Sequence, residues 1–503
     1  MTALADLTAA AAPVPASAPW PRFRVGVDIW RQAAASLAAG EVTLLSLWGE
    51  RETVHLALRD GGQVAVLSLD CPNGSFPSVG ATHAPAIRLE RAIRDLYGLT
   101  PKDAPDDRPW LDHGRWGVTR PLAAHAPEAP AATPAAAYPF LSVEGERLHQ
   151  IPVGPVHAGI IEPGHFRFTA SGETVVRLEE RLGYVHKGVD ALTTGADIAT
   201  AAQLAGRLSG DSTVAYALAF ARAVEAATGT TPPPRAVGLR ALMAELERLA
   251  NHLGDIGAIC NDASFALMHA HTSILRERVL RFAGLAFGHR LMMDRVVPGG
   301  AAADLSIASA TALSTLVGET RTRFAQLVEL YDSTASLLDR TVGTGRLDPA
   351  LAQRFAPGGY VGRAAGQPFD ARRDLAYPPY ETLAFEVPVR TDGDVNARVW
   401  VRMDEVMQGL GLIEQLAATL PDGALRTDVG AVAGEGMAIV EGFRGPVLAW
   451  LKLDGAGRVE RCHLRDPSWF QWPLLEAVIE GNIVADFPLC NKSFNCSYSG
   501  HDL

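Results

Sequence analysis

At 503 residues the chain has room for roughly two to four domains, and its 48% apolar and 20% charged residues are an ordinary globular composition. The formal net charge of −11 argues against a nucleic-acid-binding protein, because binding to phosphate backbones requires a basic surface. It also disfavours direct adsorption to anionic lipid, so we expect any membrane contact to run through a partner protein. The five cysteines are odd in number and include no CxxC pair, which indicates a reducing compartment rather than a disulfide framework.

The N-terminal part divides into a tail and a small domain. Residues 1–21 are rich in alanine and proline and contain no Lys or Arg, which is unlike a signal peptide, so we expect a disordered tail. Residues 22–100 predict a small α/β domain. In it, strand-like runs between residues 42 and 59 precede a helix over 86–97 that ends at Gly98.

Residues 101–139 contain eight prolines and many alanines, which predicts a linker. From residue 140 to the end the pattern is that of one large domain, mainly helical with a minor sheet, so the fold class is α+β. No uncharged apolar run reaches the roughly 18–20 residues of a transmembrane helix. The main expected segments are strands within 141–182, helices at 200–228, 265–292, 303–341 and 398–419, a helix that begins after Pro232-Pro233-Pro234 and includes Leu239 to Leu253, a β-rich return at 436–465 and a final helix at 471–481.

Charged residues within helix-forming, apolar surroundings are the unusual feature of the large domain. Glu245, Arg248 and His252 follow the spacing i, i+3, i+7 and therefore share one helix face. Arg276 and Arg278 recur in a second helical stretch. Either a solvated stripe or a buried charge network explains such a pattern, and both remain open at this point.

Familiar cofactor motifs are missing from the sequence. It contains no GxGxxG or Walker GxxxxGK string that would cradle the phosphates of NAD or ATP. It also has no HExxH motif or zinc-type cluster. Composition and spacing alone therefore predict only a large α+β protein with buried charges.

Several longer stretches, in a consistent order, resemble known respiratory subunits. Residues 75–99 (SFPSVGATHAPAIRLERAIRDLYGL) resemble the signature region of the small hydrophilic (thirty-kilodalton) subunit of complex I. Residues 151–168 (IPVGPVHAGIIEPGHFRF) and 181–192 (RLGYVHKGVDAL) resemble the opening of the large subunit of energy-converting nickel–iron hydrogenases. The remaining stretches are similar to both that subunit and its complex I counterpart, the quinone-site (forty-nine-kilodalton) subunit, and cover 235–257, 275–300, 369–405 and 435–470.

The order of these stretches resembles a fusion of the small and large subunits, as in the hydrogenase-3 and hydrogenase-4 lineage. Active hydrogenases of this family hold nickel and iron with four thiolates, from an RxCGxC and a DPCxxC motif. The aligned segments here are Ser209, Gly210, Asp211 and Ser212 in mid-chain and Ser497 and Gly500 at the end. Because hydroxyls cannot replace thiolates around a soft metal, the resemblance implies a polar pocket and no nickel–iron centre.

The complex I branch of the family uses this region as a quinone cavity instead. There a tyrosine and a histidine bind the quinone carbonyls, and an aspartate pairs with the histidine. By resemblance, His165 holds the histidine position and Asp262 the aspartate position, whereas the tyrosine position is Gly210. A buried His–Asp pair would favour a charged or polarised imidazole that can deliver a proton to a reduced acceptor.

The resemblance implies the large subunit of a membrane-bound oxidoreductase, peripheral on the inner face of the cell membrane. Its expected partners are an iron–sulfur small subunit, which holds a 4Fe-4S cluster, and membrane-arm subunits, with NAD binding only elsewhere in the complex. Electrons would pass to a quinone or another small acceptor, coupled to ion translocation. A non-catalytic coupling subunit is the alternative, and an active nickel–iron hydrogenase ranks last.

Overall fold

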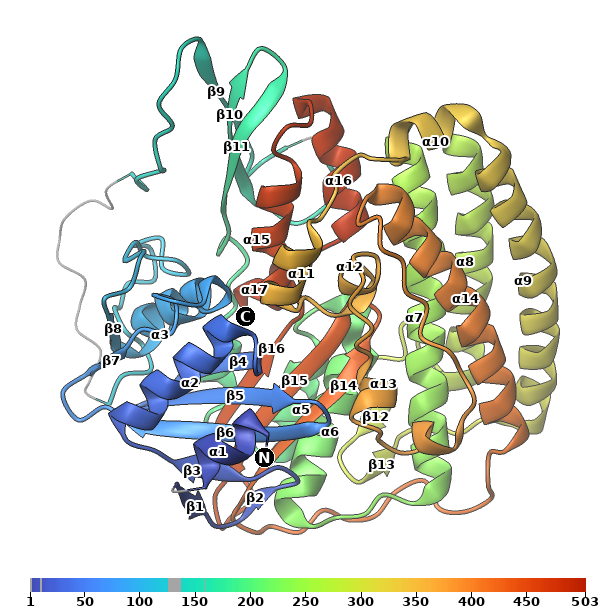
Figure 1. The fold of residues 1–503 in the computed structure, drawn as a ribbon. Helices are drawn as coiled ribbons and strands as arrows, with labels where there is room; N and C mark the ends of the chain where they lie inside the picture. Colours follow the sequence, from blue (N-terminus) through green and yellow to red (C-terminus); the bar gives the residue numbers. More distant parts are fainter. Residues whose placement is uncertain (1, 10, 125–136, 158) are drawn as a thin grey trace.

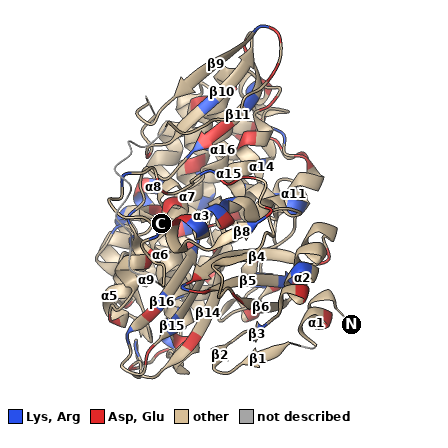
Figure 2. Cartoon of the chain, turned by 90° about the vertical axis from the view of Figure 1, so that its left-hand side faces the viewer, with Lys and Arg blue, Asp and Glu red and all other residues tan. Residues whose placement is uncertain are grey.

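The computed structural model describes residues 2–9, 11–124, 137–157 and 159–503. The fold is mixed α+β, with an N-terminal sheet, a second sheet beside it and a bundle of long helices on the far side (Figure 1). Among the described residues, no helix is long and apolar enough to cross a membrane. Lys and Arg are interspersed with Asp and Glu over the side drawn in Figure 2, so charge does not segregate there.

The N-terminal sheet has the strand order β1-β3-β6-β5-β4, with bounds β1 (Ala12–Val14), β3 (Arg22–Arg24), β6 (Gln63–Asp70), β5 (Thr53–Asp60) and β4 (Thr43–Glu50). Strands β4, β5 and β6 form an antiparallel meander, and β3 joins β6 in parallel. Helices α2 (Val27–Ala39) and α3 (Ile87–Tyr97) accompany the sheet, as does the parallel pair β7 (Ser75–Pro77) and β8 (Thr100–Lys102). The predicted helix over 86–97 is confirmed, and it ends at Gly98, whose φ of +74° is the left-handed conformation that glycine adopts most readily.

The expectation of a disordered N-terminal tail is wrong for the residues that the structure describes. The segment 1–21 was expected to be a disordered tail, yet it contains α1 (Ala3–Thr8), whose Leu4 and Leu7 are buried, and β2 (Ser17–Ala18). The linker at 101–139 packs in part, because Trp110 and Leu111 are buried and donate their N–H groups to the Asp95 carboxylate. Apolar side chains of this Pro/Ala-rich segment therefore pack into the hydrophobic core. Residues 125–136 lie outside the described part.

The second sheet, in the order β16-β15-β14-β2, is built from the antiparallel strands β14 (Gly434–Gly442), β15 (Gly445–Leu453) and β16 (Val459–Arg465), with β2 parallel to β14. These strands confirm the predicted β-rich return. Helix α6 (Thr213–Thr228) covers this sheet so closely that a Cβ atom at Gly436 would lie 1.9 Å from the carbonyl oxygen of Ala223. Glycine at this position is therefore required by packing.

The helical bundle confirms most predicted helices and divides two of them. Its long members are α7 (Pro234–Asp262), α8 (Ala266–Phe287), α9 (Ile307–Ser333) and α14 (Val395–Ala418). The expected helix 200–228 breaks into α5 (Ile198–Gly206) and α6, and the expected helix 303–341 breaks at Thr334 into α9 and α10 (Ala335–Thr341). The first of these breaks matters for function, because the interrupted turn contains Ser209 and Asp211.

Strands β9 (Leu148–Val153), β10 (His165–Ser171) and β11 (Thr174–Arg181) form a separate sheet that projects from the body (Figure 1). Helix α15 (Ser468–Val478) is not the final helix, since α16 (Phe487–Phe494) and α17 (Tyr498–Asp502) follow it. The remaining short elements are α4 (Val189–Thr193), α11 (Pro349–Phe355), α12 (Gly359–Arg363), α13 (Ala371–Asp374), β12 (Val296–Val297), β13 (Gly300–Ala301), η1 (Ala84–Ala86), η2 (Gly210–Ser212), η3 (Tyr380–Thr382) and η4 (Val484–Asp486).

The N-terminal sheet and the second sheet meet through a buried polar and aromatic contact. The rings of Trp48 and His463 stack with centroids 4.9 Å apart, and Ser46 Oγ lies 2.8 Å from His463 Nε2. At one edge Arg22 makes two hydrogen bonds to Glu435, of 2.7 and 2.6 Å. Burial, followed by the nearby arginines, holds the pKa of His463 well below its ordinary value, so this histidine is neutral inside the interface.

Candidate functional site

Two segments far apart in the chain meet at the predicted pocket. The turn before α6 carries Ser209, and the turn before α17 carries Ser497; their hydroxyl oxygens lie 3.0 Å apart. Because Ser209 Oγ already donates to Asp211 Oδ1 at 2.7 Å, Ser497 is the donor in the hydroxyl pair. A cavity of about 290 Å³ opens here, lined by residues that include Ser209, Gly210, Asp211, Arg444, Cys496 and Ser497.

An ion pair dominates this cavity, which we call the serine cavity after Ser209 and Ser497. Arg444 binds Asp211 with both terminal nitrogens, at 2.6 and 2.9 Å, and its Nε donates to the carbonyl of Asn495. Burial opposes ionisation of Asp211, but the Arg444 guanidinium and the serine hydroxyls outweigh it, so the pKa of Asp211 lies below its ordinary value. The Arg444 side chain is only 5% exposed and that of Asp211 is 37% exposed, which places the carboxylate at the mouth.

The other two predicted positions of the pocket are also here. Ser212 Oγ accepts from Arg444 Nη1 at 3.2 Å, and the Gly500 N–H donates to Ser497 Oγ at 2.9 Å. A Cβ atom at Gly500 would lie 2.5 Å from Asp466 Oδ2, an oxygen that also accepts from the Tyr216 hydroxyl. Asp466 therefore occupies the space that a side chain at position 500, a cysteine included, would need.

The side chains that line the serine cavity do not provide the ligands that a nickel–iron centre needs. Cys496 is the cysteine among the residues lining the cavity, and burial, with Glu180 and Asp466 adding to it, raises its pKa well above the ordinary value. It is therefore a thiol, whereas soft metals bind thiolates. The lining offers hydroxyls, the Asp211–Arg444 ion pair and a protonated thiol in place of thiolates, and within the described part of the chain no group of three or more His, Cys, Asp or Glu side chains is placed to hold a metal ion.

The expected pair of His165 and Asp262 is not formed. His165 begins β10, where its Nδ1 donates to the carbonyl of Gly154 at 3.0 Å and its Nε2 accepts from Arg167. Asp262 ends α7, where burial raises its pKa against the influence of Lys492. No hydrogen bond or ion pair joins the two over the described ranges; the surroundings of His165 come from the projecting sheet and those of Asp262 from the end of α7.

The imidazole of His165 is neutral at physiological pH. Burial lowers its pKa most, the Gly154 carbonyl acts in the opposite direction, and the Arg167 cation lowers it further. A neutral ring with a fixed Nδ1–H has Nε2 as its only acceptor, and Arg167 already uses it. The geometry does not support the charged or polarised imidazole that the sequence suggested.

Of the five residues expected in a buried charge network, the three on α7 are buried together. Glu245, Arg248 and His252 are 0%, 1% and 0% exposed. Arg248 donates to Glu245 at 3.2 Å and to the carbonyls of Glu441 and Gly442, so it fixes the end of β14 two residues before Arg444. The network therefore buttresses the strand that delivers Arg444 to the serine cavity.

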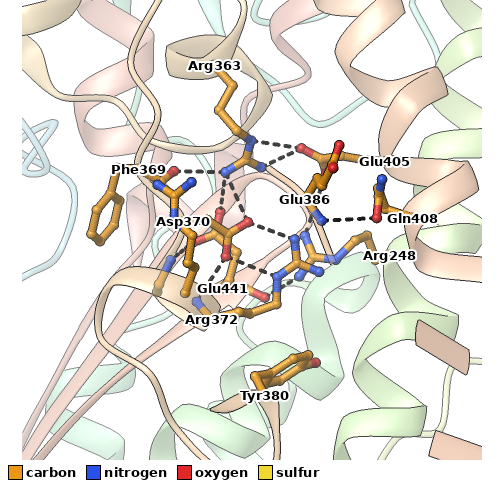
Figure 3. Close-up of polar contacts among 12 residues, drawn as sticks. Arg248, Arg363, Phe369, Asp370, Arg372, Tyr380, Glu386, Glu405, Gln408 and Glu441 are labelled. Carbon is orange, nitrogen blue, oxygen red and sulfur yellow. Dashed lines mark hydrogen bonds and ion pairs between the residues drawn. The ribbon is translucent and has the colours of Figure 1, made fainter. Parts of the chain in front are cut away.

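Figure 3 shows the charged residues that complete the network around Arg248; they come from segments distant from α7 in the sequence. Arg363 donates to Glu405 at 2.9 Å and to Glu441 at 3.0 Å. The complete set, called the α7 charge cluster below, places three arginines and a histidine against four carboxylates: Arg248, Arg363, Arg372, His252, Glu245, Asp370, Glu405 and Glu441. Burial and the Asp370 carboxylate raise the pKa of Glu441 to about 7, so the cluster holds a proton near neutrality.

Arg276 and Arg278 do not belong to this cluster, which corrects the sequence prediction. Arg278 pairs with Glu319 of α9 at 2.6 Å with side chains 38% and 54% exposed. Arg276 is half-buried and its chain covers Gly254 of α7 from outside. The two arginines, two residues apart on α8, point to different neighbours, Arg276 to α7 and Arg278 to α9, and neither reaches a carboxylate of the cluster among the described residues.

Sequence reasoning missed the partners that decide both sites. Arg444 stands in the string EGFRGP, and Asp370 and Arg372 stand in FDARRD, both within stretches already recognised as similar to the family. The available signals of buried ion pairs were the two consecutive arginines Arg372 and Arg373 and the single Arg444 within an apolar β-hairpin. Which carboxylates they pair with depends on contacts between distant parts of the chain, as for Arg444 and Asp211.

Comparison with known proteins agrees with this architecture. The family described as "Respiratory-chain NADH dehydrogenase, 49 Kd subunit" matches residues 263–434 and 427–502. Formate hydrogenlyase subunit 5 of Escherichia coli is 30% identical over 446 residues, which cover 87% of this chain and 78% of that protein. The carbon monoxide-induced hydrogenase of Rhodospirillum rubrum is 31% identical over 69% of this chain and 97% of its own length. The chain belongs to this family of hydrogenase large subunits and their complex I counterparts.

A solved structure shares the family fold. It is an archaeal respiratory membrane complex, the membrane-bound sulfane sulfur reductase, and one of its chains aligns with a TM-score of 0.68 and 25% identity. The alignment covers 71% of this chain and 99% of that one. Since the relatives carry different activities in their names, the serine cavity rather than the family has to indicate what this member does.

Proposed function

We propose that the chain is the large hydrophilic subunit of a membrane-bound oxidoreductase complex of the complex I and hydrogenase-4 type. In this proposal an iron–sulfur partner subunit delivers electrons to a small acceptor, a quinone being one candidate, in the serine cavity. The chain sits peripherally, with membrane-arm subunits that translocate ions, and its N-terminal part is a fused counterpart of the small hydrophilic subunit of complex I. It binds no nickel–iron centre.

The observation that carries the proposal is the Arg444–Asp211 ion pair at the mouth of the serine cavity. A guanidinium that is 5% exposed yet reaches a partly exposed carboxylate can polarise an oxygen of a bound acceptor as negative charge develops on it. Ser209 and Ser497 add hydroxyls that can donate or accept in the same space. These groups suit proton-coupled reduction of an oxygen-bearing acceptor and offer a soft metal no ligands.

The test compares two aspartates that make the same bidentate pair with an arginine. Asp211→Asn weakens the pair in the cavity, whereas Asp294→Asn weakens the exposed pair with Arg207. In the complex purified with its partners, we expect Asp211→Asn to lower the rate of quinone reduction about tenfold or more, as loss of a charge-assisted contact does. Asp294→Asn should leave the rate unchanged. Equal rates in both variants, or stoichiometric nickel by metal analysis, would remove the proposal.

A non-catalytic coupling subunit is the second candidate, and the α7 charge cluster favours it. A fully buried cluster that joins α7, α14 and β14 can transmit a change of position between partners without binding a redox ligand. In that case neither Asp211→Asn nor His165→Ala would alter acceptor reduction. Ion translocation by the reconstituted complex would nevertheless fall when the cluster is disturbed.

A further inference from the structure

A second cavity, between the N-terminal sheet and the large helical part, contains the buried histidine His83. His83 is 3% exposed, and neither Nδ1 nor Nε2 has a hydrogen bond among the described residues. Most buried polar groups in proteins are satisfied, so an imidazole with two free nitrogens indicates a group that the structure does not contain. Burial and the Arg354 cation lower its pKa to about 4, so near neutral pH the ring is uncharged and one nitrogen carries a hydrogen.

The cavity beside His83 has a volume of about 410 Å³ and is strongly basic. Three arginines line it, Arg59, Arg354 and Arg465, while the lining residues include no Asp or Glu. This composition differs from that of the serine cavity, where Arg444 has Asp211. The acids that act on Arg59 (Asp374 and Asp60) and on Arg465 (Asp466) lie outside the lining, so an anion in the cavity would add negative charge on the side of these guanidiniums that has none.

Two of these arginines are held in place by the protein and retain free N–H groups. Arg465 is 1% exposed; its Nε and Nη1 donate to the carbonyls of Leu45 and Pro446 at 2.8 and 2.7 Å. Arg59 donates Nη1 and Nη2 to Gly61 and Thr43, whereas its buried Nε has no hydrogen bond among the described residues. Their guanidiniums are thus preorganised, which lowers the entropy lost when a ligand binds.

We propose that this cavity binds a small phosphorylated ligand, whose phosphate group is held by Arg59, Arg465 and the N–H of His83. A phosphate offers several acceptor oxygens and up to two negative charges, which suits two guanidinium groups and a neutral donor better than a single carboxylate does. Leu37, Phe369 and Phe470 supply apolar wall for a modest organic body. The volume is near the lower end of the usual range for ligand pockets, which excludes a dinucleotide.

The position of the cavity gives the ligand a structural consequence. Arg59 and His83 belong to the N-terminal sheet and the turn before α3, whereas Arg465 ends β16 and Arg354 lies on α11. A phosphate that contacts both groups joins the two parts of the chain. Because it binds only the folded arrangement, it stabilises the whole chain by mass action.

The test uses the purified full chain and inorganic phosphate as the probe, with acetate at equal ionic strength as the comparison. Phosphate should raise the midpoint of thermal unfolding with saturation, and acetate should not. His83→Leu is expected to fold at least as stably as the parent, since it removes two unsatisfied buried nitrogens. It should weaken phosphate binding, measured by calorimetry, about tenfold.

Arg354→Gln provides a second variant at an exposed position, in case His83→Leu does not fold. It removes one of the three positive charges that line the cavity, so it should also weaken phosphate binding. Arg323→Gln is the matched control, because Arg323 is an exposed arginine on α9, on the far side of the molecule (Figure 1), and should leave binding unchanged. The proposal is overturned if phosphate has no effect on the parent, if acetate stabilises it equally, or if the foldable cavity variants bind phosphate as the parent does.

Discussion

Replacing Arg363 by methionine is the sharpest test of the α7 charge cluster. The side chain is 0% exposed and donates to Glu405, Glu441 and the carbonyl of Phe369, so no solvent screening reduces its contribution. Removing one partner of a buried ion pair costs about 3–5 kcal/mol, because the remaining charges stay buried without compensation. Since whole proteins are stable by only about 5–15 kcal/mol, Arg363→Met should remove a large share of the free energy of unfolding.

The expected shift in melting temperature follows from the size of the chain. An unfolding entropy of about 2.1 cal/mol/K per residue gives about 1.1 kcal/mol/K for 503 residues. The midpoint measured by circular dichroism should therefore fall by about 3–5 °C if the chain unfolds in one step. Urea titration of the same variant measures the free energy directly.

The loss of stability in Arg363→Met should also depend on pH, and the direction of this dependence follows from the pKa of Glu441. Its pKa is raised to about 7 in the folded protein, whereas the unfolded chain releases the proton near the ordinary value of 4.5. Stability from this group is therefore present at low pH and is lost as pH rises towards 7. Without Arg363 the pKa of Glu441 rises further, so Arg363→Met should cost less at pH 6 than at pH 8.

Arg278→Met is the control, because the Arg278–Glu319 pair is exposed and should be worth less than about 1 kcal/mol at either pH. If Arg363→Met cost no more than this control, or cost the same at pH 6 and pH 8, the account of a tightly coupled buried cluster would be refuted.

Two further predictions concern the serine cavity. Gly500→Ala should lower the free energy of unfolding by about 1–3 kcal/mol, since the new Cβ overlaps Asp466. Gly210→Ala is the control and should be nearly neutral, because no described atom lies within 4 Å of the added carbon. Thermal unfolding of both variants measures the difference. Ser497→Ala should cost about 1 kcal/mol, because the Ser497 hydroxyl caps the first turn of α17 through the Gly500 N–H, and a urea midpoint unchanged from the parent would contradict this.

Sequence patterns predicted those structural features that depend only on residues close together in the chain. The shared face of Glu245, Arg248 and His252 follows from the helical period of about 3.6 residues per turn, and the end of α3 follows from the conformational freedom of Gly98. The resemblance likewise selected Ser209 and Ser497, which do meet. It failed for His165 and Asp262, because aligned positions do not ensure a contact when the strand that carries the histidine belongs to a separate projecting sheet.

The sequence by itself determined the family, the α+β class and the helices with a clear period, because each of these depends on residue identity or short spacing. Only the tertiary structure decided which charges are buried together. Arg444 neutralises Asp211 across 233 positions, Asp466 fills the space beside Gly500, and three arginines line the cavity of His83 with no acid among the lining residues. Electrostatic and steric interactions act over a few ångströms in space, and distance along the chain does not reveal which side chains come that close.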